Sequence, residues 1–187
     1  MTDKDLWGPL AGLIGEWEGD QGIDVSFHNA KGVLGETRYR ERATFDAFGP
    51  VDNGAQRLYG LDYRMAAWRI GEENPFHTEI GYWLWDVATG HVMRCFMVPR
   101  GTTLLAAGLA KASDSSFSLE ANAGDGTCGI LSNHYLTSKA RTTKYTCSVS
   151  LNADSFSYDS CTNYVHALGG EIAHTDRNTL RRIKGAP

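Results

Sequence analysis

The chain has 187 residues, of which 42% are hydrophobic, and its formal net charge is −4. This length suits a single domain with a sizeable core, so we expect one domain over residues 1–187. The acidic balance, with no strongly basic half, argues against nucleic acid or an anionic membrane surface as the main partner.

The N-terminal stretch MTDKDLWGPLAGLIGEWEGD has neither a basic region nor a long apolar run, and no segment could span a bilayer. The four cysteines are widely spaced and include no CxxC pair, which is typical of reduced thiols rather than of a disulfide or zinc framework. We therefore expect a cytoplasmic protein without a membrane partner. The cysteines are Cys95, Cys128, Cys147 and Cys161.

Short runs of aromatic and β-branched residues follow one another along nearly the whole chain, separated by turn-forming sequences such as Asn53-Gly54 and Thr89-Gly90. Only the first dozen residues look helical, and Gly8 and Pro9 limit that helix to one or two turns. The predicted strands lie near residues 16–26, 37–47, 56–69, 76–86, 91–98, 102–110, 116–122, 127–133, 138–150, 155–166 and 172–183. The region 21–37 is expected to hold His28 in a long loop.

Sequential strands with short turns predict an antiparallel meander. About ten such strands without intervening helices predict an up-and-down β-barrel, because closure removes the exposed sheet edges. The predicted fold is therefore all-β, a roughly ten-stranded antiparallel barrel with a short N-terminal helical cap. A barrel of this size is too wide for its side chains to fill easily, and it favours a cavity for a small apolar ligand.

One face of the strand predicted at 76–86 mixes aromatic and ionisable side chains. Such a face fits a lined pocket, in which Glu79 could hold the tautomer of His77, but it also fits plain packing. The tryptophans are interpreted first as core residues, and a ligand-stacking role for one of them is the alternative. The residues on this face are His77, Glu79, Gly81, Trp83 and Trp85.

Three arginines, Arg38, Arg40 and Arg42, share one strand face with Glu36. We interpret this face as solvated, with surface ion pairs that contribute about 0–1 kcal/mol each. The alternative is a cationic patch inside the barrel that holds a carboxylate.

The last predicted strand places His174, Asp176 and Asn178 on one face. The imidazole of His174 could bind a metal, oriented by a neighbouring acceptor, or it could simply be a buried histidine that is hydrogen-bonded to Asp176 or Asn178. Hydrolase, P-loop, zinc-protease and dinucleotide-binding motifs are absent from the sequence. Any catalysis is therefore expected to come from a bound cofactor.

Gly15-Glu16-Trp17 matches the G-x-W opening of the calycin barrels, in which the glycine turns the chain into the first strand and the tryptophan plugs one barrel end. Nearly the whole chain, residues 7–183, resembles the nitrobindin-like heme-binding β-barrel family, which is also described as fatty-acid-binding-like. Four segments carry the resemblance: LAGLIGEWEGD, FHTEIGYWLWD, VPRG and HTDRNTLRRI.

The resemblance implies heme b as a macrocyclic ligand and either reversible nitric oxide binding or peroxynitrite isomerase activity. It also implies His174 as the metal ligand and His174, His77, Thr175 and Trp83 as cofactor-binding residues. In the family pattern the iron-binding position falls on Thr175, so a β-bulge near Ala173–Thr175 would be needed to bring His174 into it. The resemblance further implies that two copies could pair as a homodimer.

Two other classes of protein remain open from the sequence. One is a heme-free carrier of a lipid or aromatic small molecule, which would have arginine and aromatic side chains around its cavity. The other is a structural or interaction domain without catalysis, which would have a filled barrel interior.

Overall fold

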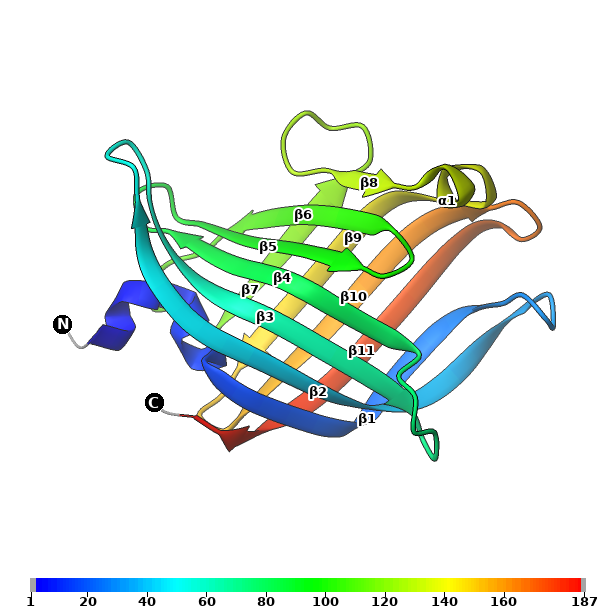
Figure 1. Cartoon of the computed structure of the whole chain (residues 1–187), viewed down its shortest axis with the longest axis horizontal. Coiled ribbons are helices and arrows are strands. Elements are labelled where there is room, and N and C mark those ends of the chain that lie inside the picture. Colours follow the sequence, from blue (N-terminus) through cyan, green and yellow to red (C-terminus); the bar gives the residue numbers. More distant parts are fainter. Residues whose placement is uncertain (1–2, 186–187) are drawn as a thin grey trace.

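The computed structural model describes residues 3–185, which form one twisted antiparallel sheet that closes on itself (Figure 1). A 3-10 helix, η1 (Asp3–Leu13), precedes the sheet, and a short helix, α1 (His134–Lys139), interrupts it. The strands are β1 (Gly15–His28), β2 (Val33–Asp52), β3 (Arg57–Arg69), β4 (His77–Asp86), β5 (His91–Val98), β6 (Thr102–Leu109), β7 (Ser116–Asn122), β8 (Ile130–Ser132), β9 (Ala140–Leu151), β10 (Ser155–His166) and β11 (Gly170–Lys184).

The strand order is β5-β4-β3-β2-β1-β11-β10-β9-β7-β6, and an additional pairing between β5 and β6 closes the ring. Ten strands therefore form the barrel wall, which confirms the predicted all-β antiparallel barrel with a short N-terminal helical cap. Strand β8 pairs with β6 outside this ring. Neither helix within residues 3–185 is long and apolar enough to cross a membrane.

Three details differ from the expectation. The segment predicted as a strand at 127–133 contributes only the three residues of β8. Helix α1 was not predicted; Asn133 caps it by accepting a hydrogen bond from the Leu136 N–H at 2.9 Å, and Leu136 is buried. His28 does not lie in a long loop, because β1 extends to His28 and β2 begins at Val33.

The two ends of the barrel differ. Helix η1 lies at one end, and the β1–β2, β3–β4 and β10–β11 turns lie at the other (Figure 1). At the η1 end, Trp17 is fully buried, packs edge-on against Phe156 and donates its indole N–H to the Leu13 carbonyl. The guanidinium of Arg182 lies 4.1 Å from the Trp17 ring and donates to the carbonyls of Gly12 and Ile14. The G-x-W tryptophan thus plugs this end, as the resemblance to the calycin barrels implies.

Candidate functional site

Solvent reaches into the barrel from the end opposite η1, which we call the mouth. Side chains that point inward near η1, such as Phe45 and Leu180, are almost completely buried. Inward-pointing side chains near the mouth, such as Thr37 and Thr162, remain partly exposed. Ionisable side chains lie along the barrel axis between the partly exposed residues of the mouth and the buried residues near η1. We call these side chains the polar layer, and they form the candidate site.

His174 points into the barrel. Strand β11 pairs with β10 in unbroken register, from Ser155↔Arg181 to His166↔Gly170, so residues two apart along β11 share a face. That face includes Leu180, which is fully buried, whereas Thr175 lies on the outer face. No bulge is present near Ala173–Thr175, and none is needed, because regular alternation already places His174 inside.

The bulge that shapes this site lies in the neighbouring strand β1. Its pairing with β2 shifts between Gly19 and Gly22, so one extra residue is inserted there. Before the bulge Trp17 points inward, and after it Asp24 points inward and pairs with Asp176 of β11. A Cβ on Gly22 would come within 2.3 Å of the Tyr39 ring, so the chain passes this point without a side chain.

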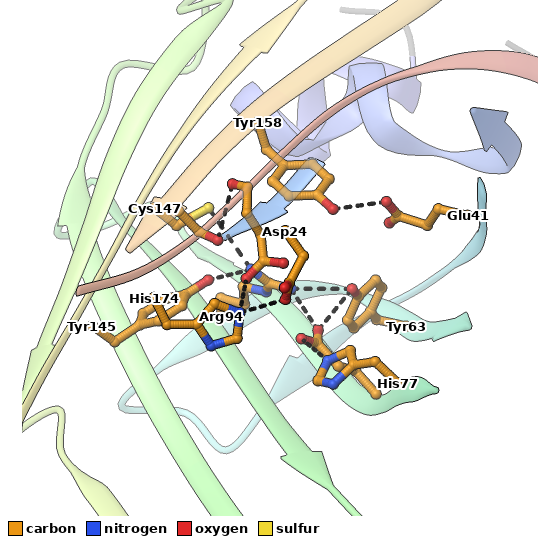
Figure 2. A network of polar contacts seen from close by, with 12 residues as sticks. Asp24, Glu41, Tyr63, His77, Arg94, Tyr145, Cys147, Tyr158 and His174 are labelled. Atoms are coloured by element: carbon orange, nitrogen blue, oxygen red, sulfur yellow. Dashed lines mark hydrogen bonds and ion pairs between the residues drawn. The ribbon is translucent and has the colours of Figure 1, made fainter. Parts of the chain in front are cut away.

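Asp24 and Asp176 hold the imidazole of His174. His174 Nε2 lies 2.7 Å from Asp24 Oδ2 and 3.1 Å from Asp176 Oδ2, and these three atoms could together bind a metal ion (Figure 2). Burial disfavours the charged imidazole, but the two carboxylates outweigh it and raise the pKa of His174 to about 10. Ser26 donates to the other oxygen of Asp24 at 2.6 Å. His174 is therefore a protonated, 29% exposed side chain between two carboxylates.

His77 belongs to a second cluster on β4 and β5. Its Nε2 lies 3.1 Å from Glu79 Oε1, and the other Glu79 oxygen lies 2.5 Å from Arg94 Nη2 (Figure 2). Burial opposes ionisation of Glu79, but Arg94 and His77 lower its pKa to about 2. Burial likewise works against the His77 cation, yet the hydrogen bond that His77 donates to the Glu79 carboxylate keeps the pKa of His77 raised. Tyr63 and Tyr145 complete the cluster around the Arg94 guanidinium.

A third group surrounds Glu41 on β2. Glu41 Oε2 accepts hydrogen bonds from the Tyr158 hydroxyl at 2.7 Å and from the Asn178 amide at 3.0 Å. The Tyr39 hydroxyl lies 2.8 Å from that of Tyr158. Burial raises the pKa of Glu41 to about 7, because it has no directly contacting cation among residues 3–185.

The other predicted candidates lie elsewhere. Trp83 and Trp85 are 4% and 3% exposed and pack in the core, so neither ring lies in the mouth. The arginine face of β2 is on the outside: Arg42 pairs with Glu16 at 3.3 Å, and Arg40 stacks on Trp68.

Sequence reasoning missed Asp24, Glu41 and Arg94 as site residues. Two of them carried a usable signal. Glu41 interrupts an inward row formed with Tyr39 and Ala43, and Arg94 lies between buried Val92 and Phe96 in the same alternation. A charge within an apolar period-2 row indicates a buried partner. Asp24 carried no such signal, because the bulge changes its face.

Comparison with known proteins agrees with this barrel. Residues 7–182 match the family described as "THAP4-like, heme-binding beta-barrel domain". The chain belongs to this family, which confirms the nitrobindin-like resemblance. A search of curated proteins gave no match.

Two solved structures align with most of this chain. The crystal structure of Rv2717c from M. tuberculosis has a TM-score of 0.67 and 19% sequence identity, and the alignment covers 94% of this chain and 95% of that one. The S-type phycobiliprotein lyase CPES from Guillardia theta gives a TM-score of 0.47 and 10% identity, over 94% and 90% of the two chains. At 19% identity the likeness to Rv2717c concerns the fold alone.

The residues present fit a heme in their donor chemistry. His174 is an imidazole that points inward and is reached by solvent, and two carboxylates can orient it, as partners of a metal-bound histidine commonly do. Among the contacts of residues 3–185, Nδ1 of His174 has no hydrogen-bond partner. Partly buried side chains also extend the inward rows of β5 and β10 toward the mouth, namely Val98 and Tyr164. Phe76 packs edge-on against Tyr39.

Proposed function

We propose that this protein binds heme b in the mouth of the barrel, where His174 would hold the iron. The observation that carries the proposal is the inward-pointing, solvent-accessible imidazole of His174 beside Asp24 and Asp176. Membership of a family named for heme binding supports the same ligand.

The chain's own residues would perform three tasks. Asp24 and Asp176 fix the orientation of the imidazole and increase its basicity. His174 ligates only as a neutral imidazole, so it has to give up one proton when heme binds. His77, held by Glu79, places a second imidazole on the inward face of β4.

Heme itself would supply the chemistry that the family resemblance implies, which is reversible nitric oxide binding or peroxynitrite isomerisation on ferric heme. We propose this activity as the finer function of the site. Stopped-flow mixing of the hemin-loaded protein with peroxynitrite tests it, and a decay rate equal to that of free hemin would contradict it.

A hemin titration tests the binding. We expect a shifted Soret band that saturates with hemin in the wild type and at least tenfold weaker binding in His174→Ala, since the axial ligand is lost. His91→Ala is the matched control, because His91 is exposed and its ring contacts Thr89 outside the mouth. Equal titrations for wild type and His174→Ala would refute the assignment of the ligand.

A heme-free carrier of a lipid or aromatic molecule is the second candidate. One observation favours it: Nε2 of His174 already contacts two carboxylates, so the imidazole does not need a metal to be satisfied. Native mass spectrometry of the purified protein distinguishes the two candidates. An organic ligand without iron, together with no Soret shift on adding hemin, would replace the heme proposal.

A further inference from the structure

A small cavity is enclosed in the core, on the η1 side of the polar layer. Its volume is about 20 Å³, which is room for one water molecule. Apolar side chains form most of its wall, and these include Leu13, Phe45, Val149 and Phe156. The polar part of the wall comes from Glu41, Trp83, Arg94 and Tyr158, with Cys147 beside them.

Two N–H donors in this wall are buried and have no partner. They are Nε1 of Trp83 and Nε of Arg94, and they make no hydrogen bond among the residues that the structure describes. Trp83 is 4% exposed and the Arg94 side chain 9%, so bulk water does not satisfy them. A buried donor without a partner costs about 1–3 kcal/mol, so two in one small cavity call for an acceptor.

Glu41 also lines the cavity and offers a carboxyl acceptor. Both side-chain hydrogen bonds that Glu41 accepts within residues 3–185 go to Oε2. Oε1 is therefore the Glu41 oxygen that remains available to accept a hydrogen bond.

We propose that the cavity binds one structural water molecule. The water accepts hydrogen bonds from Trp83 Nε1 and Arg94 Nε and donates one to Glu41 Oε1. Three partners are the usual number for a buried water. This site joins the Glu41 group to the His77–Glu79–Arg94 cluster, so that one connected polar network crosses the barrel.

The charges of the wall select water over an ion. A halide would accept from both donors but would lie against the Glu41 carboxyl. A small cation would lie beside the Arg94 guanidinium. Water both accepts and donates, so it matches all three groups.

Water-selective NMR on the intact protein tests the proposal. We expect a cross-relaxation peak between the indole N–H of Trp83 and a water molecule that stays bound for longer than the tumbling time of the protein. The Trp83 signal is assigned by its loss in Trp83→Phe. Trp17 is the internal control, because its equally buried indole N–H already donates to Leu13. Absence of the Trp83 peak would overturn the proposal.

A cavity-filling substitution provides the second measurement. Ala43 lines the cavity, so Ala43→Val should displace the water, abolish the Trp83 peak and lower the Tm by more than Ala121→Val does. Ala121 is an equally buried alanine that is not part of the wall. A Trp83 peak that persists in Ala43→Val would come from nearby hydroxyl protons rather than from the water. A higher Tm for Ala43→Val than for the wild type would indicate a dry cavity. Either result would overturn the proposal. An anomalous bromide peak inside this cavity, in crystals soaked with bromide, would also overturn the proposal.

Discussion

Glu41, Glu79 and Arg94 are ionisable side chains that the barrel buries almost completely. They differ in the partners that offset the cost of burying their charge. Glu79 and Arg94 form a direct ion pair, whereas Glu41 relies on neutral hydrogen-bond donors. The pKa values diverge accordingly, to about 2 for Glu79 and about 7 for Glu41.

The raised pKa of Glu41 predicts a pH dependence of stability. The folded pKa of about 7 exceeds the unfolded value of 4.5. The stabilising effect of protonated Glu41 is therefore fully present below pH 4.5 and is lost as the pH rises through 7. Denaturant unfolding should show this loss, up to about 3 kcal/mol at about 1.4 kcal/mol per pKa unit, in the wild type. In Glu41→Gln this part of the decrease in unfolding free energy with rising pH should be absent. Equal decreases in wild type and variant would contradict the prediction.

The Glu79–Arg94 pair predicts strong coupling. Glu79→Gln leaves the Arg94 cation buried without its counter-charge, and Arg94→Met leaves the Glu79 carboxylate with only the partly exposed His77 as its ion-pair partner. Each should lower the free energy of unfolding by about 3–5 kcal/mol. The double variant should lose clearly less than the sum of the two. Additive losses in urea denaturation would show that the pair does not act as a unit.

At the level of elements, the bulge in β1 determines which residues reach the site. It lets one strand place Trp17 in the plug at η1 and Asp24 in the mouth, although seven positions separate them and strict alternation would give opposite faces. Strict alternation counted from Trp17 therefore assigns the residues of β1 after the bulge to the wrong face.

Deletion of Gln21 should remove this bulge. Trp17 is anchored in the core, so the shorter strand should keep its first half and turn Asp24 outward. We expect the imidazole N–H of His174 to exchange faster with water in NMR spectra of this variant, because only the 3.1 Å contact with Asp176 remains once the 2.7 Å contact with Asp24 is lost. Deletion of Ala30, in the exposed β1–β2 turn, is the control. An unchanged His174 signal would show that the bulge does not position Asp24.

At the scale of the whole molecule, the barrel wall is not uniform. β1 and β2 pair along most of their length, whereas β6 and β7 share a single register pair, Ala107↔Glu120. Near that pair the backbones approach so closely that a Cβ on Gly108 would lie 1.9 Å from the Ser118 carbonyl oxygen. The β6–β7 seam thus has few ladder hydrogen bonds.

This seam should open first. Amides of β6 and β7 that point toward each other should exchange with deuterium faster than those between β1 and β2, since fewer interstrand bonds hold them. Residue-resolved hydrogen exchange under native conditions measures this, with the β1–β2 amides of the same sample as reference. Equal protection at both seams would contradict it.

Alternation and turn chemistry predicted the strand content and the closed antiparallel barrel, because both are local properties that survive in the fold. The resemblance to the calycin barrels added the tryptophan plug. The sequence by itself also placed His77 and Glu79 on the same strand face, which their spacing of two residues predicts in a regular strand, and the structure turns that face inward. The family resemblance added heme as the expected ligand.

Only the tertiary structure decided how the site is composed. The approach of Asp24 to His174 depends on pairing between strands that lie 150 positions apart and on a bulge that no local pattern announces. Glu41, Tyr158 and Asn178 meet for the same reason, from three strands. The position of His174 inside the barrel, and of Thr175 on its outer face, follows from the unbroken register between β10 and β11.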